Sequence, residues 1–403
     1  MKKYISVTLI LFSLCLLFSG CAFLQYDSNP IDELFFESEP TESYYGESEA
    51  TSVPSYDYDS MFIRNNLLSE IEKKLYDVVY TSMTKHETTI TFQTINYTFS
   101  SVTELKNSLS NVVYAVFYDN PDIFWYDNSF NYLYDENLNI TDVQVSLNMI
   151  FDENTINEML NEIEREADVI ISEISHMSEY EKSKFVYTYI AQNTNYQTSE
   201  HMHNIYGVLV DGNAVCEGYA KTYCYIMKKC GIECAVVTGI SDNVEHAWNI
   251  VKINNNYYYV DPTWGDPILD SDSQMDKKTN VDYSYLHVNS ADISKTHLLD
   301  EFFYELPEVT ATADNYYVRE GLYFTYYNEN DFSKELYNKL LQNNYSKDEI
   351  IEIKFQNISD VDKAKQYIDN NLFALCADMN NEIYKYLISY SNSGTIKLIL
   401  SYR

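Results

Sequence analysis

Basic residues are scarce in this sequence. The 403 residues include 27 Lys and Arg against 61 Asp and Glu, which gives a formal net charge of −34 at pH 7. So acidic a chain repels phosphate backbones, and we do not expect it to bind nucleic acid. The charge favours solubility and cationic partners, but it does not select a substrate.

Internal repeats are absent from the sequence, and a long apolar run occurs only at its start. Two lysines precede an apolar run from Tyr4 to Phe18, which is too short for an ordinary membrane-spanning helix. The run ends in Leu-Phe-Ser-Gly-Cys, closing at Cys21, which resembles the lipobox of bacterial lipoproteins. We therefore expect residues 1–20 to be a lipoprotein signal peptide and Cys21 to be lipidated. A plain secretory signal or an uncleaved anchor are the alternatives.

The next segment lacks any apolar period. Residues 21–58 are rich in Glu, Ser, Asp, Tyr and Thr, which predicts a disordered acidic tether. Lipid on Cys21 would hold this tether at the outer face of a bacterial cytoplasmic membrane, so we expect a lipid-anchored protein at the cell surface. Residues 59–403 remain, and they are too many for one ordinary core.

Helical and strand periods follow one another along residues 59–403, which predicts an α+β fold with more than one domain. The expected helices cover 60–80, 102–117, 156–174, 333–341 and 360–368, and one more begins at a capping box of Ser178 and Glu181. The expected strands cover 88–93, 143–150 and 349–355, with a strand or hairpin at 316–327 and a hairpin of 383–390 and 395–401. We place an N-terminal α+β region at 59–152, a middle region at 153–306 and a C-terminal α+β domain at 307–403.

The cysteines lack the close, repeated pairs of a zinc site. Cys224 and Cys230 fall on an expected helix and Cys234 begins an expected strand, so we interpret them, with Cys376, as buried thiols. A disulfide between two of them remains an alternative outside the cell.

Cys216 stands apart from the other cysteines by its place on a helix. Apolar and aromatic residues follow it at helical steps as far as Met227, and Gly231 fits a C-cap. Cys216 is therefore expected in the first turn, where free backbone N–H groups stabilise a thiolate and can bind an oxyanion. The alternative is a small hydrophobic residue on an amphipathic helix.

His246 and Asp261 lie on two β-rich runs that three asparagines separate. If Asn254 and Asn255 form a two-residue turn, Trp248 faces Asp261, and His246 lies two residues further on the same face. His246 and Asp261 are then a diagonal cross-strand pair with backbones about 7–8 Å apart. A one-residue slip would place them on opposite faces. A thiol, an imidazole and a carboxylate are the three parts of an activated nucleophile.

These segments, in combination and in order, resemble the transglutaminase-like superfamily in its bacterial secreted lipoprotein branch. The similar segments are Tyr206-Gly207-Val208-Leu209-Val210-Asp211-Gly212, Cys216-Glu217-Gly218-Tyr219-Ala220, Gly231-Ile232, His246-Ala247-Trp248-Asn249, Asp261-Pro262-Thr263-Trp264-Gly265-Asp266-Pro267 and, more weakly, Tyr283-Ser284-Tyr285-Leu286 and His297. Together they span roughly a third of the chain.

The resemblance implies a papain-like core in which a helix bearing the thiol packs on an antiparallel sheet. It assigns Cys216 as the nucleophile, His246 as the base and later the acid, and Asp261 as the residue that orients His246. The region 153–306 is then a catalytic domain. No metal or nucleotide cofactor is implied. Calcium activates some animal members, but the sequence contains no loop of the EF-hand type.

The oxyanion donors are less well defined. The backbone N–H of Cys216 is one expected donor, and three side chains are alternatives for another: Asn213, Tyr206 and Trp248. His201 and His203 form a single H-x-H, which is weak evidence for a metal site, so we interpret them as loop residues.

Taken with the export signal, the triad predicts an extracytoplasmic cysteine enzyme acting on amide bonds of proteins or peptides, cell-wall peptides among them. An amine acceptor would make it an acyltransferase, and water would make it a protease or amidase. A noncatalytic surface scaffold that retains the fold is a further alternative. A third alternative gives the main role to the outer regions, around residues 60–150 and 308–403, as binding regions for the wall or for partner proteins.

Overall fold

A computed structural model describes residues 3–8, 61–266, 281–300, 305–342, 348–378, 383–390 and 394–402. The expected mixture of helices and sheets is confirmed, and the fold is α+β. The chain forms two compact units. The first unit is Met1–Ser175, Gln197–Val237 and Glu301–Leu306, and the second is His176–Tyr196, Thr238–Asp300 and Pro307–Arg403. Among the described residues, no helix has the length and apolar character needed to cross a membrane.

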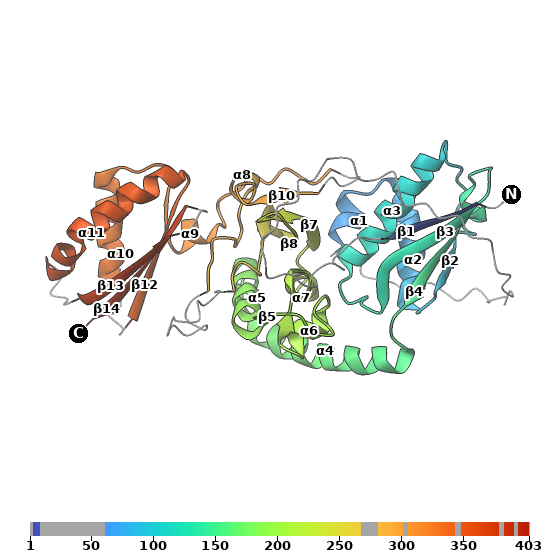
Figure 1. The fold of residues 1–403 in the computed structure, drawn as a ribbon, viewed down its shortest axis with the longest axis horizontal. Helices are drawn as coiled ribbons and strands as arrows, with labels where there is room; N and C mark the ends of the chain where they lie inside the picture. The colour runs from blue at the N-terminus through green and yellow to red at the C-terminus, as the bar shows by residue number, and fades with distance from the viewer. Residues whose placement is uncertain are drawn as a thin grey trace, which may run out of the picture. The chain divides into compact units, whose positions relative to one another are not determined.

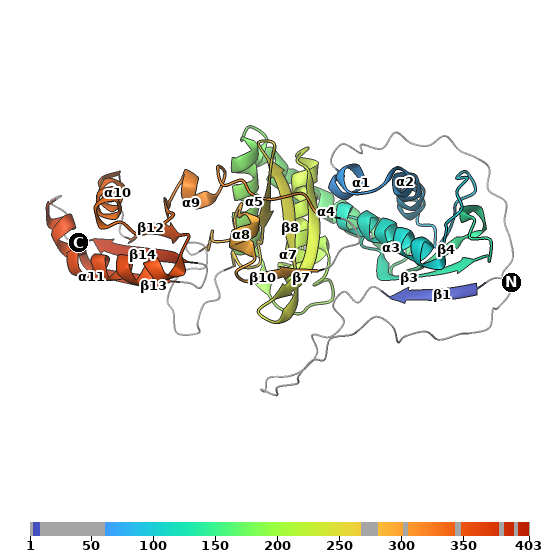
Figure 2. The same ribbon diagram turned by 90° about the horizontal axis from the view of Figure 1, so that it is seen from above.

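The first unit opens with a four-stranded sheet covered on one face by helices. The strand order is β1 (Lys3–Thr8), β3 (Tyr126–Tyr134), β4 (Gln144–Met149) and β2 (Thr89–Thr91). A 3-10 turn, η1 (Ile140–Asp142), precedes β4. The helices are α1 (Phe62–Asn66), α2 (Glu70–Thr84) and α3 (Val102–Asp119), and α2 and α3 lie over one face of the sheet (Figure 2). The buried ring of Phe130 meets Tyr114 of α3 edge-on at a centroid distance of 6.2 Å.

Two local features of this region differ from the sequence prediction. The single helix predicted over 60–80 is two helices, because Ser69 caps α2 in a reciprocal capping box with Glu72 and so ends the continuous run. Strand β3 is absent from the predicted elements. Its polar start at Asp127, Asn128 and Ser129 hides the alternation, and the pairing with β4 shifts register between Tyr126 and Phe130.

Part of the expected signal peptide is described as a strand. Residues 3–8 form β1, which pairs antiparallel with β3 from Lys3 opposite Tyr134 to Thr8 opposite Ser129. The rest of the signal peptide, Cys21 and the tether to residue 58 lie outside the described residues. Cleavage and lipidation therefore remain predictions.

The first unit also contains the helix of Cys216. Helix α4 (Glu153–Ile174) begins at an Asp152 cap, and α6 (Ile205–Leu209) begins at an Asn204 cap. Strand β6 (Asn213–Ala214) leads into α7 (Cys216–Lys229), and Gly231, with a positive φ of 74°, follows the C-cap residue Cys230. The helix start and the glycine stop expected from the sequence are both present.

The second unit contains the hairpin of His246 and Asp261. Its first helix, α5 (Glu179–Asn193), has the capping box expected at Ser178 and Glu181, and the short strand β5 (Asn195–Tyr196) follows. The sheet has the order β10 (His297–Leu299), β7 (Cys234–Ser241), β8 (Val244–Ile253) and β9 (Asn256–Val260). Strand β7 passes from the first unit into the second, and β10 pairs with its last three residues. A short helix, α8 (Ser290–Ile293), precedes β10.

The C-terminal part of the second unit has its own sheet and core. Its elements are α9 (Tyr316–Arg319), β11 (Leu322–Phe324), α10 (Glu329–Gln342), β12 (Asp348–Phe355), η3 (Ile358–Asp360), α11 (Val361–Asp378), β13 (Ile383–Tyr390) and β14 (Thr395–Tyr402). The strand order is β11-β12-β14-β13, and α10 and α11 cover one face (Figure 1). Ile396, Leu398 and Leu400 of β14 join the buried cluster beneath these helices. The intervening Lys397 therefore points to the opposite face.

The predicted hairpin of β13 and β14 is confirmed, whereas the predicted strand at 316–327 is wrong in its first half. Asn315 caps a turn of helix there, since its side chain accepts a hydrogen bond from the Tyr317 N–H. Only Leu322–Phe324 forms a strand.

Candidate active site

Cys216 occupies the first position of α7, and its side chain is buried at 2% exposure. The preceding loop packs tightly against this turn, because the Val215 N–H donates to the Met202 carbonyl at 3.1 Å. Gly218 permits that approach, since a Cβ there would lie 2.7 Å from the Met202 oxygen and 2.8 Å from the Ala214 Cβ. Close packing of the preceding loop therefore positions the thiol at the helix start, where the N-cap residue Val215 makes no side-chain cap.

A buried charge cluster lies directly beside Cys216 in the chain. The Glu217 side chain is 2% exposed and pairs with the Lys221 Nζ at 2.7 Å and the His203 Nδ1 at 2.9 Å. Burial alone would raise the pKa of Glu217, but Lys221 and His203 outweigh it, so the pKa lies below its ordinary value. Glu217 is not among the site residues expected from the sequence, and His203 lies in a turn, as expected. Only the i, i+4 spacing of Glu217 and Lys221 was a local signal.

The hairpin turn has the geometry expected from its three asparagines. Asn254 and Asn255 have positive φ values of 49° and 65°, as a type I′ turn requires. Ile253 pairs with Asn256, and the register continues outward to Asn249 opposite Val260. The predicted register is confirmed as far as Asn249 and Val260, and Trp248 and Asp261 are the next residues along the two runs.

This register brings the imidazole and the carboxylate together. His246 is 6% exposed and Asp261 is fully buried. The His246 Nε2 and the Asp261 Oδ2 lie 2.7 Å apart. The hydrogen bond expected from the hairpin is therefore present.

Asp261 accepts hydrogen bonds at both carboxylate oxygens. Oδ2 is also 2.9 Å from the His297 Nε2, and Oδ1 accepts from the backbone N–H groups of Thr263 at 2.9 Å and Trp264 at 3.4 Å. Burial works to raise the pKa of Asp261, but His246 and His297 outweigh it and hold the pKa well below its usual range. Asp261 is consequently a carboxylate held in its ionised form inside the protein.

His297 also belongs to this site. In the sequence it is only a weak part of the resemblance to the transglutaminase-like superfamily. Strand β10 places it on β7, and its Nδ1 lies 2.8 Å from the Thr296 Oγ1. That hydroxyl also accepts from the Tyr285 hydroxyl at 3.1 Å. A Thr296 hydroxyl that donates to Nδ1 leaves the Nε2–H of His297 to donate to Asp261.

The same bonding pattern defines the chemistry of His246. Its Nε2 faces Asp261, so in the neutral ring Nε2 carries the proton and Nδ1 carries the basic lone pair. The indole ring of Trp248 lies 6.0 Å from the His246 ring at an interplanar angle of 22°. The Trp248 Nε1 is buried and has no hydrogen-bond acceptor among the described residues.

The other expected oxyanion donors have partners elsewhere. The Tyr206 hydroxyl donates to Glu162, and the Asn213 Nδ2 donates to the Asp211 carbonyl at 2.9 Å. Trp248, in contrast, has a buried indole donor without an acceptor among the described residues.

Two groupings of histidine bear on metal binding. His246, Asp261 and His297 have ligand atoms within 4.8 Å of one another, a spacing that could hold an ion. Both Nε2 atoms face one carboxylate oxygen at hydrogen-bond distance, however, which fits protons between them better than a metal. His201 and His203 pair with different carboxylates, since His201 Nδ1 lies 2.8 Å from Asp211.

The described cysteines other than Cys216 are also free thiols: Cys224, Cys230, Cys234 and Cys376. The Cys224 Sγ contacts the Cys234 carbonyl at 3.3 Å, which is a packing arrangement rather than a disulfide. Cys216 belongs to the first unit, and His246, Asp261 and His297 belong to the second. The approach of the thiol to the imidazole therefore remains a prediction.

Comparison with known proteins agrees with the resemblance. Residues 170–262 match the family model of the transglutaminase-like superfamily. This segment contains Cys216, His246 and Asp261, so the similarity predicted from these residues is confirmed there. No curated protein matches the sequence.

Solved structures with partial similarity include three proteins. A TGase has 16% identity and a TM-score of 0.25, with 30% of this chain and 41% of that chain covered. A candidate cysteine protease from Cytophaga hutchinsonii has 13% identity and a TM-score of 0.24, with coverage of 34% and 54%. Menin, described with its binding site for Mixed Lineage Leukemia protein, has 15% identity and a TM-score of 0.22, with coverage of 36% and 31%. The chain thus spans less than two thirds of each.

Proposed function

We propose that this protein is a cysteine-dependent acyl-transfer enzyme that uses Cys216, His246 and Asp261 on amide bonds of proteins or peptides. One observation carries the proposal. The buried His246–Asp261 pair and the helix-start Cys216 lie in one segment that matches the transglutaminase-like family model. A buried, ionised carboxylate beside an imidazole is the arrangement that makes the imidazole a general base.

The proposed reaction begins with proton transfer from the Cys216 thiol to the Nδ1 of His246. The thiolate attacks the amide carbonyl carbon, and a tetrahedral oxyanion forms. His246 then returns the proton to the departing nitrogen, which leaves as ammonia or an amine, and a thioester remains on Cys216. An amine or water attacks the thioester and releases the acyl group. The same residues serve both acceptors.

Asp261 and His297 have distinct roles in this scheme. Asp261 orients His246 and stabilises the imidazolium that forms when the thiol is deprotonated. His297 acts through Asp261 as a positioning residue, because its bond to Oδ2 holds the carboxylate in place. Neither residue needs to touch the substrate.

Oxyanion stabilisation is assigned to two donors. The backbone N–H of Cys216 lies at the start of α7, where the helix supplies positive partial charge. The Trp248 indole N–H is a buried donor without an acceptor among the described residues. A donor that binds the oxyanion of the reaction intermediate is expected to have no acceptor before that oxyanion forms. Trp248 is therefore the preferred side-chain donor.

The proposed location and substrates rest on the expected export signal. A lipid on Cys21 would tether the enzyme to the outer face of the cytoplasmic membrane, where surface proteins and cell-wall peptides are the accessible amides. The scheme needs no metal or nucleotide.

The decisive test is incubation with a glutamine-donor peptide and a labelled primary amine. Incorporation of label identifies an acyltransferase, and release of ammonia or cleavage without incorporation identifies a hydrolase. Cys216→Ala should abolish either activity, whereas Cys230→Ala, at the end of the same helix, should leave it unchanged. Activity that survives in Cys216→Ala would exclude the proposed nucleophile.

Thiol reactivity separates the enzyme from a noncatalytic scaffold. Cys216 should react with iodoacetamide near neutral pH, and His246→Ala should slow that reaction at least tenfold, because the base is lost. Equal and slow labelling of both proteins would favour the scaffold.

A further inference from the structure

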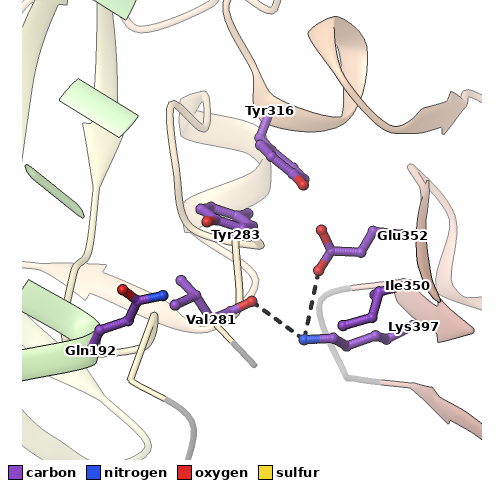
Figure 3. Close-up of a pocket in the computed structure, with 7 residues that line it drawn as sticks. All are labelled: Gln192, Val281, Tyr283, Tyr316, Ile350, Glu352 and Lys397. Atoms are coloured by element: carbon purple, nitrogen blue, oxygen red, sulfur yellow. Dashed lines mark hydrogen bonds and ion pairs between the residues drawn. The ribbon is translucent and has the colours of Figure 1, made fainter. Parts of the chain in front are cut away.

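A small cavity lies in the second unit, apart from the residues of the proposed triad. Its volume is ≈ 180 Å³. At about 30 Å³ of liquid volume per water, it has room for roughly six waters or a ligand of a few heavy atoms. The cavity is lined by Gln192 of α5, by Val281, Tyr283 and Tyr316, and by three residues of the C-terminal sheet, Ile350, Glu352 and Lys397 (Figure 3).

The two charged residues of the cavity form an incomplete ion pair. The Lys397 Nζ is 3.9 Å from the Glu352 Oε1, and it donates to the Val281 carbonyl at 3.4 Å. Both side chains are largely buried, at 18% and 10% exposure. A buried carboxylate and a buried ammonium at this separation each retain capacity for a further charged partner.

Electrostatics support that reading of Glu352. Burial raises the pKa of Glu352 to about 7, although Lys397 and Lys184 act against the shift, and Asp282 adds to it. The Tyr316 hydroxyl bonds to the carboxylate and is its neutral partner. Glu352 is therefore short of compensating positive charge, in contrast to Asp261.

The aromatic wall of the cavity is rigid. The rings of Tyr283 and Tyr316 stack with centroids 4.2 Å apart and an interplanar angle of 19°. The Tyr283 hydroxyl is 3.0 Å from the Thr188 Oγ1, which fixes the ring from α5. Lys184 lies 5.3 Å from the Tyr316 ring centre, but its charge is already paired with Glu320.

Hydrogen bonds hold the two sides of the cavity together. The Ser284 Oγ donates to the Thr395 Oγ1 at 3.2 Å, which joins the segment of Tyr283 to strand β14. The site is therefore formed before any ligand enters, as small-molecule sites usually are.

We propose that this cavity binds a small free amino acid, whose ammonium group pairs with Glu352 and whose carboxylate pairs with Lys397. A cation alone would meet the like charge of Lys397, and an anion alone would meet that of Glu352. A zwitterion satisfies both groups in a low-dielectric space. The volume of the cavity fits an amino acid of the size of glycine, alanine or serine. The proposal does not rest on acyl transfer.

Matched ligands test the charge requirement by calorimetric titration of the full-length protein. Alanine should bind with one site per chain. Alaninamide, which keeps the size and the ammonium group, and isobutyrate, which keeps the size and the carboxylate, should bind at least tenfold more weakly. Alaninamide or isobutyrate binding as tightly as alanine would overturn the proposal, and so would an absence of alanine binding at 10 mM.

Variants then locate the site. Glu352→Gln and Lys397→Met should each weaken alanine binding at least tenfold, whereas Glu329→Gln and Lys385→Met, at exposed positions, should not change it. Gln192→Ala leaves the ion pair intact and serves as a third cavity variant if Glu352→Gln or Lys397→Met fails to fold. It should weaken alanine binding at least threefold. Unchanged binding in all three cavity variants would place the ligand elsewhere. Cys216→Ala should bind alanine normally, which separates this proposal from the proposed catalysis.

Discussion

Asp261 and Glu352 are both buried carboxylates of the second unit, yet their surroundings shift their pKa values in opposite directions. Asp261 accepts from two histidines and two backbone N–H groups, and its pKa is held well below its usual range. Glu352 has a lysine at 3.9 Å and a tyrosine hydroxyl, and its pKa is raised to about 7. Burial alone therefore does not determine the charge of an acid. The number and distance of the donors decide it.

The largest expected effect comes from removing the well-compensated acid. Asp261→Ala leaves His246, His297 and two backbone N–H groups without their acceptor, which should cost about 3–5 kcal/mol of stability. Catalysis should fall by a factor on the order of 10³ or more, since His246 loses its orientation. Urea unfolding and the amine-incorporation rate measure the two effects. A loss below about 1 kcal/mol would contradict the role of Asp261 as a structural acceptor.

Replacing the poorly compensated acid should change the pH dependence of stability instead. The folded-state pKa of Glu352 lies above its unfolded value of 4.5, so protonation favours the folded state. That contribution is fully present below about pH 4.5 and is lost as the pH rises through about 7. Glu352→Gln should therefore gain on the order of 2–3 kcal/mol relative to the wild type between pH 4.5 and 8. Unfolding in urea across that range measures it, with Glu329→Gln as the exposed control, and parallel curves for wild type and Glu352→Gln would contradict the shift.

Substitutions of His297 remove only one of the four hydrogen-bond donors to Asp261, so they should weaken its compensation without abolishing it. His297→Leu removes one charged hydrogen bond from Asp261, which should cost about 1.5–3 kcal/mol. His297→Asn keeps a donor and should recover part of that loss. If His297 has a purely structural role, the pH profile of Cys216 alkylation should not change in either variant. If His297 positions Asp261, the profile should shift in His297→Leu and return toward that of the wild type in His297→Asn. Identical profiles in both variants would rule out positioning through Asp261.

The smallest effect is expected at the hairpin turn that brings Asp261 to His246. Asn255 has a positive φ of 65°, so Asn255→Ala should cost roughly 1 kcal/mol through backbone strain. Asn255→Gly should cost nothing, because glycine adopts this conformation freely. Thermal unfolding of the two variants measures the difference. Equal melting temperatures would mean that the turn contributes no strain energy.

Local sequence patterns were sufficient for the hairpin and for the helix of Cys216. Two asparagines specify a type I′ turn, and that turn fixes the register that pairs His246 with Asp261. Gly231 specifies the end of α7. Each depends on residues close together in the chain, which is why a single sequence contains the information.

The remaining features of the site depend on distant residues. His297 lies 36 positions from Asp261, and its hydrogen bond follows from the pairing of β10 with β7, which no local period encodes. The partnership of His203 with Glu217 and the cavity at Glu352 arise in the same way. Strand β3 was missed for a different reason, because its polar start conceals the alternation.

The Asn254–Asn255 turn has a consequence for how this protein can vary. Exposed loop tips usually accept insertions and deletions without harm. Adding or deleting one residue in this turn would rotate every side chain of one strand to the other face of the sheet. An exposed turn far along the strands from His246 is therefore constrained in length. Homologues that keep the His246–Asp261 pair should differ in the composition of this turn but not in its residue count.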